Sequence, residues 1–272
     1  MSEQLNTWER MELIHNKNRP TVNDYIPMIF DEFYELHGDR CFGDDPAILG
    51  GIGKFSGIPV TVIGEVKGRD LEENRKANFG CPHPEGYRKA LRLAKQAEKF
   101  HRPVICFIDT PGAFCGVAAE ERGQGEAIAR NLFEFSQLKT PVISIVLGEG
   151  GSGGALALGV CDSLAMLQNA VYSVISPRGC ASILWKDASR EKEAAERLHI
   201  TAEDLVRFGV CDAIIPEPPG GAHTDPRLTA ENIADYILET LRKIQQKGVA
   251  NLLEARYNKF RKIGDFEEIP GI

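Results

Sequence analysis

Two glycine-rich segments, each following an apolar run of strand length, could together hold a negatively charged oxygen. Residues 103–108 lead through Asp109-Thr110-Pro111 to Gly112 and Ala113, and residues 141–147 lead to the sequence Gly148-Glu-Gly150-Gly151-Ser152-Gly153-Gly154. The second segment precedes a stretch rich in Ala and Leu, so we expect it to open a helix. Amides at a helix start lack intrahelical acceptors, and glycine lets a ligand oxygen approach them closely. The pattern indicates an oxyanion hole, or else only a tight turn and close helix packing.

Ser152, inside the second segment, is a candidate nucleophile. A serine hydroxyl needs a base to take its proton, usually a histidine. The histidines stand at 15, 37, 83, 101, 199 and 223, and none lies in the segment at the end of the third apolar run, Val174-Ile175-Ser176-Pro177. A phosphate-binding loop is also disfavoured, because Lys-Ser or Lys-Thr is missing after the glycines. A dinucleotide-binding fingerprint is disfavoured too, because the acidic residue expected about 20 residues beyond it is missing.

Three carboxylates near the first segment could form a general acid/base pair: Asp109, Glu120 and Glu121. Asp109 equally suits the cap of a turn, and the two glutamates suit the exposed start of a helix. No other proton-transfer group is evident near the glycines. This favours a reaction whose proton acceptor belongs to the substrate or a cofactor.

The elements that position these segments follow from periodicity. Helices are expected over 7–15, 22–36 and 88–99, and a hairpin over 48–55 and 58–66. The runs at 103–108, 141–147 and 170–175 are apolar on consecutive residues, as in strands covered on both faces. Thr201-Ala-Glu-Asp204 resembles a capping box, and a final helix over 229–247 is expected to stop at Gly248. The order predicts an α/β fold, a ββα unit followed by repeated βα units.

Composition describes an ordinary globular chain. Its 272 residues are 43% hydrophobic and 26% charged, with a formal charge of −7, which argues against a duplex nucleic-acid binder. No apolar run could span a bilayer and the start lacks signal-peptide features, so we expect a cytoplasmic protein without a membrane partner. The seven cysteines never form CxxC, so we expect reduced thiols and no metal site in this chain.

Charge is unevenly distributed along the chain. Residues 65–102 carry ten Lys/Arg against six Asp/Glu, a local +4. Such a stretch could meet a phosphorylated ligand or an acidic partner, and Lys67, Arg69, Arg88 and Lys89 are the candidates. The alternative for residues 88–99 is a solvated helix face, because Leu91, Ala94 and Ala97 keep a helical period.

Ten strings, in this order from about residue 8 to about residue 222, closely resemble the alpha subunit of bacterial acetyl-coenzyme A carboxylase carboxyltransferase. They are Arg19-Pro20, Asp24-Tyr25-Ile26, Gly38-Asp39-Arg40, Lys67-Gly68-Arg69, Asn78-Phe79-Gly80, residues 84–90, residues 107–113, residues 119–124, residues 148–158 and residues 172–177. The resemblance implies a crotonase-like (ClpP/crotonase) spiral of ββα units. It also implies N-terminal helices over 1–36 that pack on the core or a partner, and a carboxyltransferase domain over 37–272.

The resemblance further implies an activity and an assembly. That family transfers a carboxyl group from carboxybiotin, on a separate biotin carboxyl carrier protein, to acetyl-CoA, giving malonyl-CoA in the first committed step of fatty acid synthesis. A beta subunit with a zinc ribbon would complete an alpha2beta2 carboxyltransferase. A biotin carboxylase would supply the ATP-dependent ligase step of the whole enzyme.

By the same resemblance the alpha chain supplies the oxyanion hole on the biotin side. We assign it to the amides of Gly153 and Gly154, with Gly112 and Ala113 as facing donors and with Gly150, Gly151 and Ser152 beside the cofactor. Four positions depart from the family pattern: Arg178 stands where glutamate is usual, Phe114-Cys115 replaces Tyr-Pro, and Val66 stands where Gln is often found.

Other readings of the sequence stay open. The chain could be a carboxyltransferase subunit for another acyl-CoA, a non-catalytic scaffold partner as the altered Arg178 would allow, or a stand-alone hydrolase that uses Ser152.

Overall fold

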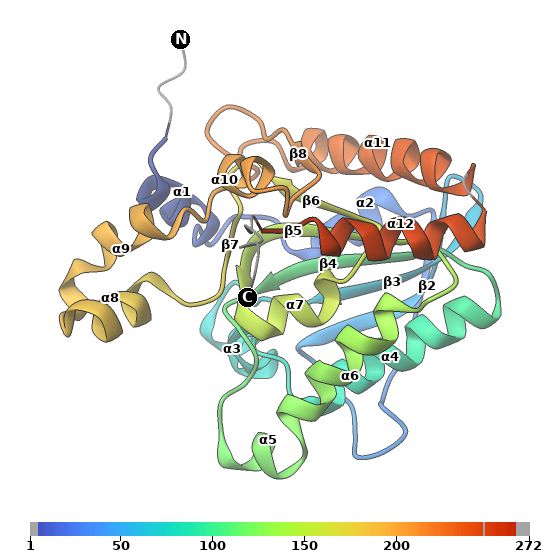
Figure 1. The fold of residues 1–272 in the computed structure, drawn as a ribbon, viewed down its shortest axis with the longest axis horizontal. Coiled ribbons are helices and arrows are strands. Elements are labelled where there is room, and N and C mark those ends of the chain that lie inside the picture. Colours follow the sequence, from blue (N-terminus) through green and yellow to red (C-terminus); the bar gives the residue numbers. More distant parts are fainter. Residues whose placement is uncertain (1–4, 247, 265–272) are drawn as a thin grey trace, which may run out of the picture.

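The computed structural model describes residues 5–246 and 248–264 around one eight-stranded sheet (Figure 1). Its order is β1-β2-β3-β4-β5-β6-β8, and β7 pairs with β5. The strands are β1 (Glu32–Glu35), β2 (Ile48–Phe55), β3 (Ile58–Glu65), β4 (Val104–Thr110), β5 (Val142–Gly151), β6 (Ser163–Leu167), β7 (Val171–Ser173) and β8 (Ala213–Ile215). β1, β2 and β3 are antiparallel, whereas every later pairing is parallel.

Helices cover this sheet and extend beyond it. They are α1 (Thr7–Ile14), α2 (Val22–Ile29), α3 (Leu71–Lys76), α4 (Pro84–Lys99), α5 (Val117–Glu121), α6 (Gln124–Ser136), α7 (Ser152–Gly159), α8 (Pro177–Trp185), α9 (Glu191–Leu198), α10 (Ala202–Arg207), α11 (Pro226–Gln245) and α12 (Val249–Arg261). Two short 3-10 turns lie at Asn78–Gly80 and Ala188–Arg190. In Figure 1, α8 and α9 project from one side of the molecule, next to α1.

The two faces of the sheet are identified by close contacts at glycines. A Cβ on Gly50 would lie 2.4 Å from the Leu93 side chain of α4, and a Cβ on Gly64 would lie 2.5 Å from Val22 of α2. Gly50 pairs with Ile63, the neighbour of Gly64, and successive strand residues face opposite sides. α4 and α2 therefore cover opposite faces, and β4 between them is buried along its whole length.

The predicted ββα unit and the βα units after it are confirmed. The hairpin, the two buried strands and the helix opened by Ser152 all form, and Thr201 caps α10 by accepting from the Asp204 amide at 3.3 Å. β5 runs on through Gly151 instead of ending at Leu147, because its last residues pair with β7 and with Thr110 of β4. The run at 170–175 yields only the three-residue β7.

Other boundary predictions were wrong. The helix expected over 22–36 ends at Ile29, two residues after Pro27, and β1 follows it to pair with β2. The apolar residues that predicted one helix over 22–36 are divided between α2 and the edge strand β1. β6 was not predicted, and α12 follows the helix expected to be the last. That helix ends at Gln245, and its expected last residue, Lys247, lies outside the described residues.

No helix in the described ranges has the length and apolar character needed to cross a membrane.

Arg256 connects α12 to the sheet. Its side chain is 1% exposed and pairs with Asp162 at 2.7 and 2.9 Å. The same guanidinium donates to the carbonyls of Phe135, Leu138 and Thr140 at 2.8, 2.8 and 3.0 Å. One buried cation thus satisfies a carboxylate, a carbonyl at the end of α6 and two carbonyls of the loop before β5.

We predict that Arg256→Met lowers the free energy of unfolding by about 3–5 kcal/mol, because it leaves Asp162 buried without its cation. Urea denaturation followed by circular dichroism measures the change. Arg227→Met is the matched control, since Arg227 lies 88% exposed in an i,i+4 pair with Glu231. Equal stability of the two variants would contradict the structural role given to Arg256.

Candidate active site

The structure brings the two glycine segments into direct contact at the carboxyl edge of the sheet. β4 and β5 are adjacent, and Thr110 pairs with Gly150 after a register shift. A Cβ built on Gly154 would lie 2.6 Å from the Ala113 nitrogen, and one on Gly151 only 2.2 Å from the Pro111 carbonyl oxygen. Such separations leave no room for a side chain. Glycine at 151 and 154 therefore permits one backbone to lie against the other.

The start of α7 leaves its first amides without a cap. Gly151 is the N-cap residue and has no side chain to accept from them. Gly153 and Gly154 lie in the first turn, whose amides lack intrahelical acceptors, and no loop carbonyl of the described residues accepts from either. Ser152 itself adopts a left-handed conformation, with φ of 50°. This turn is an N–H-rich surface at the positive end of a helix.

A hollow of about 270 Å³ lies beside Gly153. Its walls are mostly apolar and comprise Ser152, Gly153, Leu156, Tyr172, Ser173, Val174 and Leu205. A Cβ on Gly153 would come no closer than 3.7 Å to its nearest neighbour, Ile128. There is consequently open space beside Gly153, whereas Gly154 is enclosed.

The facing residues, Gly112 and Ala113, differ in their availability. The Gly112 amide donates to Thr110 Oγ1 at 3.0 Å, and the Thr110 hydroxyl lies 2.6 Å from the Gly80 carbonyl oxygen. In the part of the chain described, nothing accepts from the Ala113 amide. Gly112 has φ of 146°, a conformation that favours glycine. The geometry thus argues against Gly112 as a donor and leaves Ala113.

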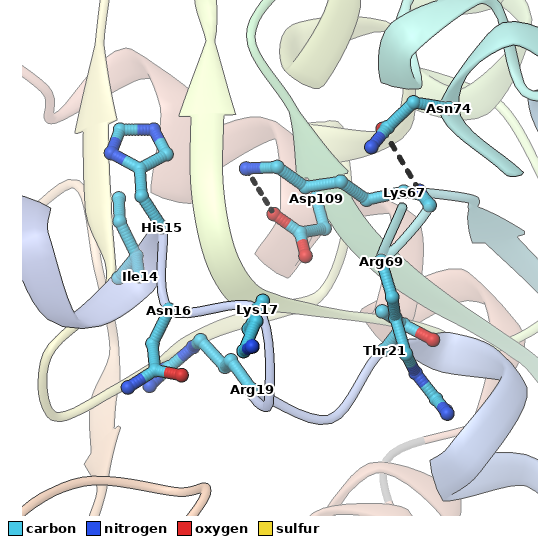
Figure 2. Close-up of a pocket in the computed structure, with 11 residues that line it drawn as sticks. Ile14, His15, Asn16, Lys17, Arg19, Thr21, Lys67, Arg69, Asn74 and Asp109 are labelled. Atoms are coloured by element: carbon cyan, nitrogen blue, oxygen red, sulfur yellow. Dashed lines mark hydrogen bonds and ion pairs between the residues drawn. The ribbon is translucent and has the colours of Figure 1, made fainter. Parts of the chain in front are cut away.

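Sequence reasoning missed a charged cluster at the same sheet edge. Lys67 Nζ lies 3.9 Å from Asp109 Oδ1 (Figure 2). It also lies 3.2 Å from Glu149 Oε2, and His15 Nε2 lies 3.3 Å from the same oxygen. Asp109 also accepts from the Glu149 amide at 2.9 Å. Asp109 is therefore part of a buried charge network, rather than only the cap of a turn.

A signal for this cluster is present in the sequence. Lys67 follows β3 closely, Asp109 lies near the end of β4, and Glu149 lies near the end of β5. The carboxyl ends of neighbouring parallel strands meet at one edge, so charged residues there belong to one site. His15 arrives from the segment after α1, a contact that strand order does not predict.

Burial and neighbouring charges shift the pKa values of Glu149 and Lys67 in opposite directions. Burial raises the pKa of Glu149, but hydrogen bonding to His15 and the charge of Lys67 outweigh it and hold the pKa at about 2. Burial lowers the pKa of Lys67, but the charges of Asp109 and Glu149 leave it above its ordinary value. Glu65, beneath them, is fully buried, and this burial raises its pKa well above the usual range. Lys67 and Glu149 are thus a stable ion pair near neutral pH.

The other predicted cations differ in their surroundings. Arg69 pairs with Asp24 and lines, with Lys67 and Lys17, a pocket of about 160 Å³ (Figure 2). The Lys89 side chain is 1% exposed. Its Nζ donates to the Ile48 carbonyl at 2.8 Å and pairs with Asp44 Oδ1 at 2.8 Å.

Arg88 donates to Asp39 at 2.8 Å and to the Arg122 carbonyl at 3.0 Å. Both Arg88 and Lys89 hold the loop at 37–45, so the excess positive charge is balanced largely within the chain. This placement argues against a ligand contact for Arg88 and Lys89. Because Lys89 is buried, the helix face expected over 88–99 is not wholly solvated.

Comparison with known proteins establishes the family. The model of the acetyl co-enzyme A carboxylase carboxyltransferase-like family matches residues 1–264. The chain belongs to this family. It is 58% identical over 267 residues to the acetyl-coenzyme A carboxylase carboxyl transferase subunit alpha of Clostridium acetobutylicum, covering 98% of this chain and 97% of the relative. It is 60% identical to the subunit of the same name from Anoxybacillus flavithermus, covering 97% of this chain and 81% of that one. The predicted relationship to the alpha subunit is confirmed.

Solved carboxyltransferases share the fold of this family member. Transcarboxylase 12S superposes with a TM-score of 0.65 at 20% identity over 97% of this chain, which spans about half (46%) of that longer chain. The malonate decarboxylase MdcD–MdcE hetero-dimer of Pseudomonas gives a TM-score of 0.60 at 18% identity, covering 78% of this chain and 84% of that one. The crotonase-like fold class expected from sequence is confirmed.

The departures from the usual family pattern lie near the site. Phe114 stacks on His83 with ring centroids 4.1 Å apart, and Val66 donates its amide to the Ala47 carbonyl at 2.9 Å. Arg178 is exposed in the first turn of α8, and no described residue pairs with its guanidinium. In the described residues, no group of three His, Cys, Asp or Glu is placed to hold a metal ion.

We predict that Glu149→Gln removes a pH-dependent part of the stability. Since the folded pKa of about 2 lies below the ordinary 4.5, the contribution is complete above about pH 5 and is lost as pH falls toward 2. At about 1.4 kcal/mol per pKa unit, it is on the order of 3 kcal/mol at neutral pH. Urea unfolding of both proteins between pH 7 and 3 should show the gap narrowing. The exposed Glu231→Gln is the control for a lost surface charge, and a constant gap for Glu149→Gln would contradict the prediction.

Proposed function

We propose that this chain holds the biotin side of an acetyl-CoA carboxyltransferase, moving a carboxyl group from carboxybiotin to acetyl-CoA to form malonyl-CoA. The observation that carries the proposal is the uncapped first turn of α7 beside an open hollow. Its Gly153 and Gly154 amides have no acceptor from a loop of the described chain. Family membership supports the same reaction. The cofactor would arrive on a separate biotin carboxyl carrier protein, in the cytoplasm.

The hollow suits a small ring with apolar faces and one polar edge. Leu156, Val174 and Leu205 offer apolar contact, and Ser152 and Gly153 at the start of α7 line one side. Bound there, carboxybiotin supplies the carboxyl group and a ring nitrogen able to accept the proton of the acyl-CoA. The amides of Gly153 and Gly154 would donate to its carbonyl oxygen as negative charge develops, and the Ala113 amide would be a further donor. Fixed donors of this kind are worth about 3–4 kcal/mol each in rate.

The described residues that line the hollow offer no side chain suited to act as a catalytic base. None of the described residues that line it is a histidine, a carboxylate or a lysine. Ser152 consequently has no base among them, which argues against a hydrolase. Gly150 and Gly151 keep the strand end close to Pro111 and do not need to touch the cofactor themselves.

Lys67 and Arg69 are proposed to hold anionic groups of the ligand or partner. The Lys67 side chain is 20% exposed, and both residues reach the pocket drawn in Figure 2, together with Lys17. Arg88 and Lys89 would act indirectly, by fixing the loop at 37–45.

The face beside the hollow supports a second carboxyltransferase subunit as partner. Val174, Ile183 and Leu184 are 78%, 68% and 66% exposed, on the approach to α8 and along it. We propose that a beta subunit with a zinc ribbon covers this face in an alpha2beta2 assembly and supplies the oxyanion hole for the acyl-CoA thioester. Biotin carboxylase would load the carrier protein in an ATP-dependent step.

Paired alanine substitutions test the oxyanion assignment. In the chain assembled with its beta subunit, Gly154→Ala is expected to lower carboxyl transfer about 10²–10³-fold, because its Cβ would displace the Gly112–Ala113 backbone. The matched control is Gly125→Ala in α6, where a Cβ would meet nothing within 4 Å, and it should stay within about twofold of the natural chain. The measurement is malonyl-CoA formation from carboxybiotin and acetyl-CoA.

The same assay separates the alternatives. Circular dichroism and sedimentation with the beta subunit show whether Gly154→Ala still folds and assembles. Full turnover of a folded Gly154→Ala protein would contradict the oxyanion assignment. Faster transfer to propionyl-CoA or a longer acyl-CoA would indicate another substrate, and assembly without turnover in the natural chain would indicate a scaffold.

A further inference from the structure

Strand β5 changes its partner just before α7. Residues 143–146 of β5 pair with β6, whereas residues 149–151 pair with β7. Ser173 at the end of β7 and Val174 after it line the same hollow as Gly153. The part of β5 between its two paired stretches therefore joins the regular sheet to the hollow.

β5 bulges at this change of partner. Thr110 follows Ile108 of β4 by two residues, but their partners in β5, Val146 and Gly150, are four residues apart. β5 thus has two more residues than β4 over this stretch. A bulge bends a strand and redirects the residues that follow it. The bulge, residues 147–149, therefore fixes where the first turn of α7 meets the segment after β4.

The Asp109 carboxylate lies against this bulge. Its Oδ1 accepts from the Glu149 amide at 2.9 Å, and a Cβ built on Gly148 would lie 2.8 Å from the same oxygen. Glu65 holds Asp109 in turn, since its Oε2 accepts from the Asp109 amide at 3.1 Å. Asp109 is 4% exposed, and Lys67 Nζ lies 3.9 Å from its Oδ1 (Figure 2). A buried side-chain oxygen thus accepts from a backbone donor of the bulge.

A second side chain binds the other end of the bulge. Arg19 Nη2 donates to the Leu147 carbonyl at 2.7 Å, and its Nε donates to the same oxygen at 3.3 Å. Arg19 is 4% exposed and is held by its pair with Glu217. Side chains therefore bind a carbonyl at the start of the bulge and an amide at its end, and these bonds favour one conformation of the extra residues.

We propose that Asp109 is a positioning residue for carboxyl transfer, because its bond to the Glu149 amide fixes the bulge that sets α7 against the Gly112–Ala113 segment. The inference rests on the proposed function. Asp109 does not line the hollow, and its Oδ1 faces the Glu149 amide and Lys67. It therefore acts through the backbone, which differs from the general acid or base considered from the sequence.

Three substitutions separate a positioning role from a chemical one. Asp109→Ala removes the acceptor of the Glu149 amide, and Gly148→Ala places a Cβ against that acceptor while its charge remains. Asp109→Asn keeps an oxygen able to accept from the amide and loses the charge. Since misplacement by about 1 Å can cost 10²-fold, both alanine variants should lower kcat about 10–100-fold, whereas Asp109→Asn should stay within about fivefold. KM for acetyl-CoA should stay within about twofold in all three, because the beta subunit is proposed to supply the acyl-CoA hole.

The experiment uses the complex with the beta subunit. Malonyl-CoA formation gives kcat and KM, sedimentation shows assembly, and hydrogen exchange with mass spectrometry follows the amides of residues 147–156. These amides should exchange about tenfold faster in both alanine variants and at an unchanged rate in Asp109→Asn. Gly125→Ala in α6, where a Cβ would meet nothing within 4 Å, is the matched control that should change neither measurement.

Each result decides the proposal. Lower kcat and faster exchange in the alanine variants, with both restored in Asp109→Asn, support it. An Asp109→Asn complex as inactive as Asp109→Ala would overturn it in favour of acid–base chemistry or charge. Unchanged exchange or full turnover in an assembled Gly148→Ala complex would overturn it as well, and this variant and Asp109→Asn decide alone if Asp109→Ala does not assemble. A natural complex that transfers no carboxyl group would refute the proposed function, while hydrogen exchange would still decide whether Asp109 fixes the bulge.

Discussion

The close approach of two backbones at the ends of β4 and β5 is the constraint on which the site depends. Adjacent parallel strands deliver their following loops to one edge of the sheet, so the start of α7 and the segment after Thr110 must share a small space. Side chains at 151 or 154 would enter the neighbouring backbone, within 2.2–2.6 Å. Glycine at these positions removes that conflict and leaves α7 without a capping side chain. The close packing of the two backbones and the uncapped first turn of α7 therefore have one cause, the glycines at 151 and 154.

The N-terminal segment is part of this edge. Arg19 donates to the Leu147 carbonyl at 2.7 Å and pairs with the buried Glu217 at 2.7 Å, joining the segment before α2 to β5 and to the loop after β8. Burial lowers the pKa of Arg19, but its bond to Glu217 leaves the pKa above the usual value, so the cation persists. His15 reaches Glu149 from the same segment. Residues 5–36 therefore supply a helix, an edge strand and charges to the core unit.

Sequence patterns predicted the parts that depend on local chemistry. Apolar runs identify β4 and β5 because burial on both faces needs them, and the Ala- and Leu-rich stretch after the glycines identifies α7. The Thr201 capping box is equally local. The helix expected through Leu36 was wrong because pairing of β1 with β2 overrides the local helical period of the side chains.

Charges were the least predictable feature. Arg88 and Lys89 belong to a basic stretch in sequence, but in space they meet Asp39 and Asp44 of a loop more than forty residues away. Lys67, Asp109 and Glu149 are far apart in the chain and adjacent at the sheet edge. The net charge of a sequence segment does not include partners that are distant in the chain. The position of a charged residue relative to a strand end does reflect which strands are neighbours in the sheet. Strand-end position is thus the better guide to which charged residues meet at the sheet edge.

The open side of the hollow connects the chemistry to assembly. Charge on a developing oxyanion is stabilised most where water is excluded, because the local dielectric is low. Val174 and Leu156 are 78% and 39% exposed, so the part of the chain described closes only one side of the hollow. A partner that covers this apolar wall would exclude water from the glycine amides and strengthen their hydrogen bonds in the same step. Under the proposed function, association and catalytic competence are therefore coupled through solvent exclusion, without any need for a change in the fold of this chain.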